Sequence, residues 1–227
     1  AKKYFSILKA SHSILWNDGP RLKKLQKELN EVELANVEDG KGKNVWYCIG
    51  YAIARNSAEA VAFHDCDIKT YDENILIKLF YPLLNDSMGY SFSKGYYPRY
   101  ADNKFNGRVT RLLVTPLIKS LMKLFGNNDY LEFIDSFRYP LAGEYALKKN
   151  LLREIRIPSD WGLEIGILSE LQRSYSSKLC CQVDLADHYD HKHQVLSEND
   201  KTKGLSRMTI DITKAFLRKM ATQGYIF

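Results

Sequence analysis

The chain has 227 residues, and its 33 Lys and Arg against 27 Asp and Glu give a formal net charge of +6. Apolar residues make up 45% of the chain and aromatic residues 12%, which excludes a disordered or low-complexity protein, and the length suits one α/β domain with its own core. No apolar run approaches the roughly 20 residues of a membrane-spanning helix, so no membrane span is predicted. The modest positive charge fits phosphorylated small molecules as well as nucleic acid and does not choose between them.

The cysteine pattern bears on the cellular compartment. The four cysteines form no CxxC pair, and two of them are adjacent: Cys48, Cys66, Cys180 and Cys181. This pattern argues against a structural zinc site and against a disulfide framework. The first residues, AKKYFSILKASHS, lack the long apolar stretch and the small-residue cleavage site of a secretory signal peptide. We therefore expect a reducing compartment, the cytoplasm.

The apolar pattern predicts helices and strands that alternate along the chain. A short apolar run at 13–16 ends in the turn signal Asn17-Asp18-Gly19-Pro20, and leucines at helical spacing follow. Helices are expected at 44–55, 74–84, 108–125, 144–150, 161–174 and 209–220, and strands at 58–63, 89–94 and 179–185. This order predicts an α/β fold with an open, mostly parallel twisted sheet flanked by helices, which binds ligands beyond the carboxyl ends of its strands.

The sharpest local signal is Asp65-Cys66-Asp67, directly after the expected strand 58–63. Two carboxylates one residue apart at a strand end can both reach a hard cation, one directly and the other through water or a sugar hydroxyl. Mg²⁺ or Mn²⁺ held in this way would bridge a diphosphate and neutralise it as it leaves. The alternative is a surface turn with two solvated carboxylates, because a bare DxD motif also occurs by chance.

Three of the five histidines, His188, His191 and His193, fall within six residues after the expected strand 179–185. An imidazole there can complete the coordination of a cation or, when protonated, donate to a phosphate. The alternative is a polar, solvated loop. The clustering predicts that at least one of these histidines is functional.

Two glycine-containing segments have the composition of anion sites. Gly107-Arg108-Val109-Thr110 opens the expected helix 108–125, where free N–H groups and a bidentate Arg favour a phosphate or carboxylate. Gly40-Lys41-Gly42-Lys43 lets the backbone approach a ligand and places an ammonium nearby, although the P-loop spacing is absent. Taken alone, the first also fits a helix start with an exposed Arg, and the second a flexible basic loop.

Two further segments, YPLAGEY at 139–145 and SDWGLE at 159–164, place a glycine beside acidic and aromatic residues. Glycines allow close packing on a sugar ring and carboxylates can hold its hydroxyls, whereas the alternative is an ordinary loop that enters a helix. The chain shows no GxSxG, no HExxH and no Ser/His/Asp arrangement that supports a nucleophile. RNP-like aromatic motifs and zinc fingers are also absent, which weakens a nucleic-acid function.

Taken in chain order, GKG, the strand-end DCD, GRVT, PLAGEY, DWGLE and HKH resemble the retaining glucosyl-3-phosphoglycerate synthases. The resemblance runs from about residue 16 to about residue 194, and its specificity lies in the order of the motifs. It implies a GT-A-type glycosyltransferase fold in one domain, 1–227, with donor binding in about 1–100 and acceptor binding and a C-terminal helix in about 101–227. It also implies an NDP-sugar donor, Mg²⁺ or Mn²⁺, 3-phosphoglycerate as acceptor, and a homodimer without a nucleic-acid partner.

The resemblance assigns roles residue by residue. The implied metal ligands are Asp67 and His191, with His188 as a competitor for the metal. The implied catalytic residues are Asp65, Asp67 and Glu164. The donor would contact Lys41, Asp65, Leu141, Gly143 and Glu164, and Asn17 and Asp18, at the end of the run 13–16, are expected to contact the nucleoside. The acceptor would contact Gly107, Arg108, Thr110 and His193, the last of which stands where relatives carry Asn.

Two other classes remain as alternatives. A sugar-1-phosphate nucleotidyltransferase shares the sheet plan and a metal aspartate, but it requires a Gly-rich N-terminal loop of the GxGxR type, which is not seen. A non-enzymatic basic module that binds nucleic acid would show salt-sensitive affinity and no binding of nucleotide sugars.

Overall fold

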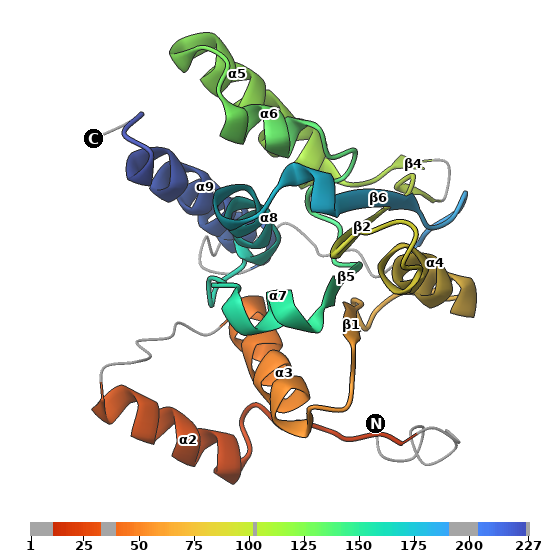
Figure 1. Cartoon of the computed structure of the whole chain (residues 1–227). Coiled ribbons are helices and arrows are strands. Elements are labelled where there is room, and N and C mark those ends of the chain that lie inside the picture. Colours follow the sequence, from red (N-terminus) through yellow and green to blue (C-terminus); the bar gives the residue numbers. More distant parts are fainter. Residues whose placement is uncertain (1–10, 33–39, 102–103, 191–203, 226–227) are drawn as a thin grey trace.

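The computed structural model describes residues 11–32, 40–101, 104–190 and 204–225. The helices, most of which surround a small sheet (Figure 1), are α2 (Pro20–Glu31), α3 (Lys41–Arg55), α4 (Glu73–Leu84), η1 (Thr110–Val114), α5 (Thr115–Phe125), α6 (Asp129–Asp135), α7 (Lys149–Glu154), α8 (Leu163–Ser174), η2 (Ser177–Leu179) and α9 (Gly204–Thr222). Within these ranges, none of the helices has both the length and the apolar character needed to cross a membrane.

Four strands form the main sheet in the order β1-β5-β2-β6, with bounds β1 (Ala60–Phe63), β5 (Tyr145–Lys148), β2 (Phe92–Tyr96) and β6 (Cys180–Asp184). Strand β5 runs antiparallel to both β1 and β2, and β6 runs parallel to β2. Three strands therefore share one direction and β5 opposes them, which makes the sheet mixed. A separate antiparallel pair joins β3 (Tyr100–Ala101) to β4 (Lys104–Phe105). The predicted α/β class is confirmed.

The sheet separates two apolar cores, because successive side chains of a strand point to opposite faces. In β5, Tyr145 and Leu147 belong to the core that includes α8 and α9, whereas Ala146 belongs to the core under α4. Figure 1 shows α4 on one side of the sheet and α8 with α9 on the other. The inner strands β5 and β2 are therefore covered on both faces, whereas the edge strands β1 and β6 are only partly buried.

Three expected elements differ from the structure. The predicted helix 144–150 is wrong in its first half, where β5 pairs on both sides and only residues after Lys148 are helical. The predicted helix 108–125 changes from the π-helical turn η1 to α5, as expected where Pro116 lacks the N–H that an α-helix requires. The run 13–16 forms no strand, and Trp16 is 56% exposed.

Candidate active site

Lys41 is the first residue of α3, and its neighbours fix where it points. A Cβ at Gly42 would lie 1.8 Å from the carbonyl oxygen of Pro158, so only glycine allows the helix to approach this segment. The backbone N–H groups of Gly42 and Lys43 donate to the carbonyls of Asp160 and Ser159 at 3.2 and 2.9 Å. The glycines predicted to approach a ligand therefore approach the protein's own backbone, and the expected flexible loop is the start of a helix.

The Lys41 side chain joins two carboxylates from distant parts of the sequence. Its Nζ lies 2.6 Å from Asp65 Oδ1, just after β1, and 2.7 Å from Glu164 Oε1, in the first turn of α8. Burial opposes the charged ammonium, but the charges of Glu164 and Asp65 outweigh it and raise the pKa of Lys41. The structure thus brings three residues predicted for the donor site into one charged cluster, called here the Lys41 cluster.

Gly143 forms a wall of this cluster. A Cβ at position 143 would lie 2.5 Å from Asp65 Oδ2, so a larger residue would displace the carboxylate. Leu141 is half-buried against the core, and Ala142 is fully buried between them. The predicted donor-side residues Leu141 and Gly143 therefore lie in one turn beside Asp65.

Glu144 connects the Lys41 cluster to an aromatic group behind it. Its Oε1 accepts from the backbone N–H of Asp65 at 3.4 Å, and its Oε2 accepts from the hydroxyl of Tyr97 at 2.6 Å. Burial, followed by the charge of Asp65, raises the pKa of Glu144. Tyr97 in turn stacks on Tyr189, with 3.6 Å between the ring centroids, and meets the edge of Tyr139. Sequence patterns assigned no role to Tyr97, whereas Glu144 is the carboxylate of the YPLAGEY segment, for which contact with sugar hydroxyls was one of the two interpretations.

Tyr97 also lines a cavity of about 290 Å³, called here the anion pocket. Its described lining residues include three arginines and no carboxylate, and they are Tyr97, Arg99, Asn106, Gly107, Thr110, Arg111, Thr115, Arg138 and Tyr139. Arg99 Nη1 donates to the hydroxyl of Tyr139 at 2.6 Å, and Arg138 Nη1 donates to that of Tyr96 at 3.1 Å. A cavity with this charge suits a small anion.

The acceptor residues predicted from GRVT are placed unequally. Gly107, which has a φ of +72°, and Thr110 line the anion pocket, whereas Arg108 is exposed and is not among the lining residues. The pocket's cations are instead Arg99, Arg111 and Arg138. Of these three, Arg99 could have been predicted from the sequence, because it closely follows the carboxyl end of β2, where ligands bind in such sheets.

The predicted cation ligands lie at the edge of the described chain. Asp67 is half-buried in the turn after β1, whereas His191 and His193 lie outside the described residues. His188 is exposed, and the described residues contain no group of three His, Cys, Asp or Glu side chains arranged to hold a metal ion. Neither the predicted pair nor the alternative histidine is therefore tested directly.

The chain just before His191 is nevertheless fixed close to the turn that carries Asp67. The backbone N–H of Lys69 donates to the carbonyl of Asp190 at 2.8 Å, and the N–H of Asp190 donates to Thr70 Oγ1 at 3.0 Å. Lys69 Nζ also lies 2.9 Å from Asp190 Oδ2. Residue 190 is thus held beside residues 69 and 70, which closely follow Asp67.

Asn17 and Asp18, predicted for the nucleoside, are exposed in the turn before α2. The described side-chain contacts of residues 11–32 with α3 involve residues of that helix other than Lys41. Gln26 Oε1 in α2 accepts from the Tyr47 hydroxyl at 2.7 Å, and Ser13 lies 2.7 Å from the Tyr51 hydroxyl. The nucleoside role of Asn17 and Asp18 remains a prediction.

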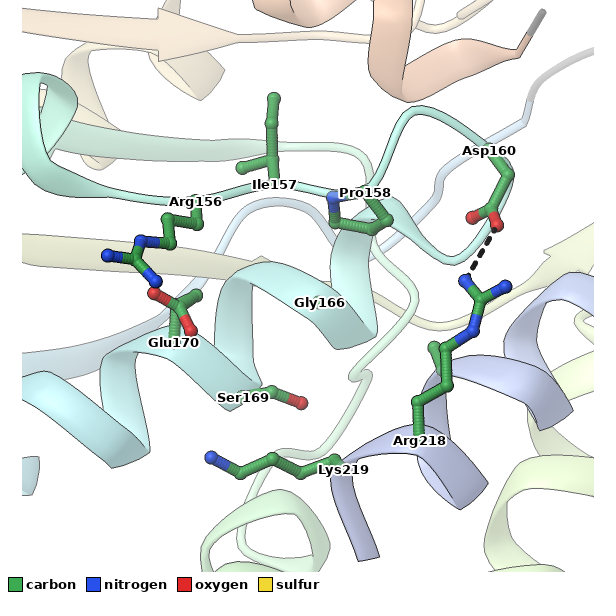
Figure 2. A pocket seen from close by; sticks show the side chains of 10 residues that line it. Arg156, Ile157, Pro158, Asp160, Gly166, Ser169, Glu170, Arg218 and Lys219 are labelled. Carbon is green, nitrogen blue, oxygen red and sulfur yellow. Dashed lines mark ion pairs between the residues drawn. The ribbon is translucent and has the colours of Figure 1, made fainter. Parts of the chain in front are cut away.

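A second cavity, of about 300 Å³, contains none of the predicted site residues and is called here the balanced cavity. Its lining residues are Arg156, Ile157, Pro158, Asp160, Gly166, Ser169, Glu170, Ala215, Arg218 and Lys219. Figure 2 shows Arg218 pointing toward Asp160, and these two form an ion pair at 3.8 Å. Glu170 is paired with Arg173 at 2.8 Å. The lining residues of this cavity thus combine three cations with two carboxylates, and each carboxylate has an ion-pair partner.

Comparison with known proteins gives one consistent result, although no family model matches the chain. A glucosyl-3-phosphoglycerate synthase of Persephonella marina is 42% identical over 226 residues, which cover all of this chain and 56% of that protein. The chain thus spans about half the length of the curated relatives it matches.

Solved structures agree with this similarity. Glucosyl-3-phosphoglycerate synthase from Mycobacterium tuberculosis, in complex with Mn²⁺, UDP-glucose and phosphoglyceric acid, matches with a TM-score of 0.65 at 25% identity. The match covers 85% of this chain and 59% of that one. Mannosyl-3-phosphoglycerate synthase from Rubrobacter xylanophilus matches with a TM-score of 0.67 at 25% identity, over 89% of this chain and 57% of that one. The mixed sheet flanked by helices is therefore that of the GT-A glycosyltransferases.

Proposed function

The chain is a homologue of the glucosyl-3-phosphoglycerate synthases, and on that premise we propose that it transfers a hexose, glucose in the first instance, from an NDP-sugar to 3-phosphoglycerate. The product is glucosyl-3-phosphoglycerate, formed with retention at the anomeric carbon. Relatives crystallised with Mn²⁺, UDP-glucose and phosphoglyceric acid support each of the three ligands.

The observation that carries the proposal is the position of Tyr97. Its ring lines the anion pocket, while its hydroxyl donates to Glu144, which accepts from the backbone of Asp65. One tyrosine thus separates a cavity with three arginines from the Lys41 cluster. A glycosyl transfer requires this adjacency, because the acceptor hydroxyl must reach the anomeric carbon of the bound donor, and for retention it approaches on the face that the diphosphate leaves.

The residues present fit a divalent cation. Asp65 and Asp67 supply carboxylate oxygens, which Mg²⁺ and Mn²⁺ prefer, and an imidazole from residue 191 would suit Mn²⁺ in particular. The contacts of Asp190 with Lys69 and Thr70 support a shared site for Asp67 and His191. When bound, the cation neutralises the negative charge that develops on the departing diphosphate.

The chain's own residues then have separate tasks. Lys41 orients Asp65 and Glu164 at the donor, and Leu141 with Gly143 would pack against the sugar ring. Arg99, Arg111 and Arg138 would hold the phosphate and carboxylate of 3-phosphoglycerate, with its 2-hydroxyl facing the anomeric carbon.

The proposed step balances without a nucleophile from the protein. The bond from the anomeric carbon to the phosphate oxygen breaks, and the bond from that carbon to the acceptor oxygen forms on the same face. The acceptor's hydroxyl proton goes to the leaving phosphate oxygen. Catalysis then rests on positioning and on charge stabilisation.

The test combines binding and turnover. Melting temperatures are measured with UDP-glucose, GDP-glucose or ADP-glucose in Mn²⁺, with and without 3-phosphoglycerate, and product is sought by mass spectrometry. We expect one donor to raise the Tm, the acceptor to raise it further, and Asp67→Ala to abolish the effect of Mn²⁺. The absence of any response to all donors, or transfer by Asp67→Ala at the wild-type rate in Mg²⁺, would contradict the proposal.

We further propose a cytoplasmic homodimer. The four cysteines are unpaired in the structure, as expected in a reducing compartment. Leu112 and Leu124, on η1 and α5, are 66% and 71% exposed, so they offer an apolar surface for a second copy. Light scattering after gel filtration measures the mass, and Leu124→Glu is expected to give a monomer. A monomeric wild-type protein at micromolar concentration would contradict the dimer.

A further inference from the structure

Lys94 is the most deeply buried cation among the described residues. It lies in β2, between β5 and β6, and only 2% of its surface is exposed. Lysine is almost never fully buried without a partner, because its ammonium loses its hydration shell. Neither the family resemblance nor the proposed transfer step assigns it a role.

The Lys94 ammonium has a short and specific contact. Nζ donates to the carbonyl oxygen of Ala142 at 2.6 Å and lies 5.2 Å from the centre of the Tyr145 ring. Ala142 is fully buried, and its own N–H donates to the carbonyl of Tyr139 at 3.1 Å. The carbonyl that Lys94 binds thus belongs to the turn that contains Leu141 and Gly143.

This turn forms part of the Lys41 cluster. Gly143 packs so closely on Asp65 that a Cβ would lie 2.5 Å from the carboxylate. A shift of the turn by a few tenths of an ångström would therefore move Asp65, and Lys41 with it. Lys94 is the side chain that ties this turn to the central strand of the sheet.

The charges that act on Lys94 come from four separate segments of the chain. They are Glu164 on α8, Glu144 at the start of β5, Lys41 on α3 and Asp65 after β1. Tyr145 is the titratable group opposite Lys94 on β5. With Lys94 included, the group has two cations and three carboxylates, so its ammonium offsets part of an excess of negative charge.

We propose that Lys94 is a positioning residue for the transfer reaction, whose ammonium holds the Leu141–Gly143 turn against Asp65. The inference rests on the proposed function and deepens it. Because a charged donor makes a stronger hydrogen bond than a neutral one, loss of the proton weakens this anchor. Burial lowers the pKa of Lys94 to about 8, so the loss falls within an accessible pH range.

The experiment compares Lys94→Met with Lys78→Met. Methionine keeps the length of lysine without its charge or donor. Lys78 Nζ makes the same kind of bond, to the carbonyl of Leu185 at 2.9 Å, but Leu185 follows β6 and does not belong to the Leu141–Gly143 turn. The measurements are kcat, the KM for the donor and for the acceptor, the pH profile of kcat from 6.5 to 10, and hydrogen exchange of the peptide 139–145.

In Lys94→Met we expect kcat to fall at least tenfold with the acceptor KM changed less than twofold, and exchange at 139–145 to accelerate. In the wild type, kcat should decline above about pH 8, and this decline should be absent in Lys94→Met. Lys78→Met should match the wild type in all four measurements. Unchanged kcat, or unchanged exchange at 139–145, in folded Lys94→Met overturns the inference.

The experiment also distinguishes a failure of Lys94→Met to fold from a failure of the proposed function. If Lys94→Met does not fold, the wild-type pH profile decides, and a constant kcat between pH 7 and pH 9.5 overturns the inference. If the wild type transfers no sugar, the proposed function fails by itself, and the hydrogen exchange of the two variants still decides whether Lys94 holds the turn.

Discussion

The anion pocket and the balanced cavity have nearly the same volume, about 290 and about 300 Å³, but differ in the charges of their lining residues. Among the described residues, the lining of the anion pocket has three arginines and no carboxylate, and Tyr97 connects the pocket to the Lys41 cluster. In the balanced cavity, one of the two lining arginines pairs with the cavity's own aspartate, as Figure 2 shows for Arg218 and Asp160.

Volume therefore does not distinguish the two cavities, whereas the charges of their lining residues do. A cation that already pairs with a carboxylate of its own cavity gains little from binding an anionic ligand. Arginines that line a cavity without a carboxylate gain more, because the ligand supplies the negative charge. The following predictions test this contrast, from the largest expected effect to the smallest.

Replacing the central cation of the Lys41 cluster is expected to have the largest effect. Lys41→Met leaves Asp65 and Glu164 without their common partner, and transfer should fall about 10²- to 10³-fold in kcat, as when one preorganised charge-stabilising group is removed. Arg218→Ala, in the balanced cavity, should leave kcat unchanged. An equal loss of kcat in the two variants would contradict the proposed functional difference between the Lys41 cluster and the balanced cavity.

The lowered pKa of Lys94 predicts that the stability of the fold rises with pH, whereas its proposed role predicts that kcat falls with pH. Its folded-state pKa, about 8, lies below the ordinary lysine value of 10.5. Between these two pH values the unfolded state binds the proton that the folded state has lost, so stability rises with pH. The free energy of unfolding should increase by about 3 kcal/mol more in the wild type than in Lys94→Met between pH 7 and pH 10.5.

Denaturant titrations at several pH values measure this difference. Lys219, in the balanced cavity, also has a lowered pKa, because of burial first and then the charge of Arg173. It is half-exposed, so solvent screens it and Lys219→Met should show a shift of the same sign but smaller size. A larger shift for Lys219 than for Lys94 would contradict the assigned difference in burial.

The arginines of the anion pocket should affect the acceptor alone. A hydrogen bond to a charged group contributes about 1.5–3 kcal/mol, so Arg111→Ala should raise the acceptor KM roughly 10- to 100-fold. The donor KM should remain within twofold of the wild type. Arg108→Ala is the matched control on the adjacent turn. Both arginines are exposed, but of the two only Arg111 lines the anion pocket, so we expect Arg108→Ala to have the smaller effect. A larger increase of the acceptor KM in Arg108→Ala than in Arg111→Ala would indicate that Arg108 binds the acceptor.

The sequence predicted the parts of the site that depend on local order. Asp65 and Asp67 were found because a strand end followed by two carboxylates is a local pattern, and Gly107 and Thr110 because they lie next to a helix start. Strand β5 was missed since its four residues, Tyr145–Lys148, are too short for helical and strand periodicity to be told apart.

The parts that were missed depend on tertiary structure. Arg99, Arg111 and Arg138 come from three separate segments and share a cavity only after folding. Lys94 reads as an ordinary polar position in a strand, because the pairing of β2 on both sides, which buries it, is not visible in a sequence. The glycines at 40 and 42 were predicted to allow a close approach to a ligand, but in the structure they allow a close approach to the segment 158–160.

The smallest expected effect comes from giving the anion pocket the missing carboxylate. Thr115 is an exposed lining residue of this pocket, so Thr115→Glu adds a negative charge without disturbing the core. Partly screened repulsion near a surface amounts to about 1 kcal/mol, so the acceptor KM should rise about fivefold at low salt and less in 0.5 M KCl. Thr115→Gln has nearly the same size and should match the wild type at both salt concentrations. A glutamate that leaves the acceptor KM unchanged at low salt would mean that the anion binds elsewhere, and the charge difference between the two cavities would then not identify the site.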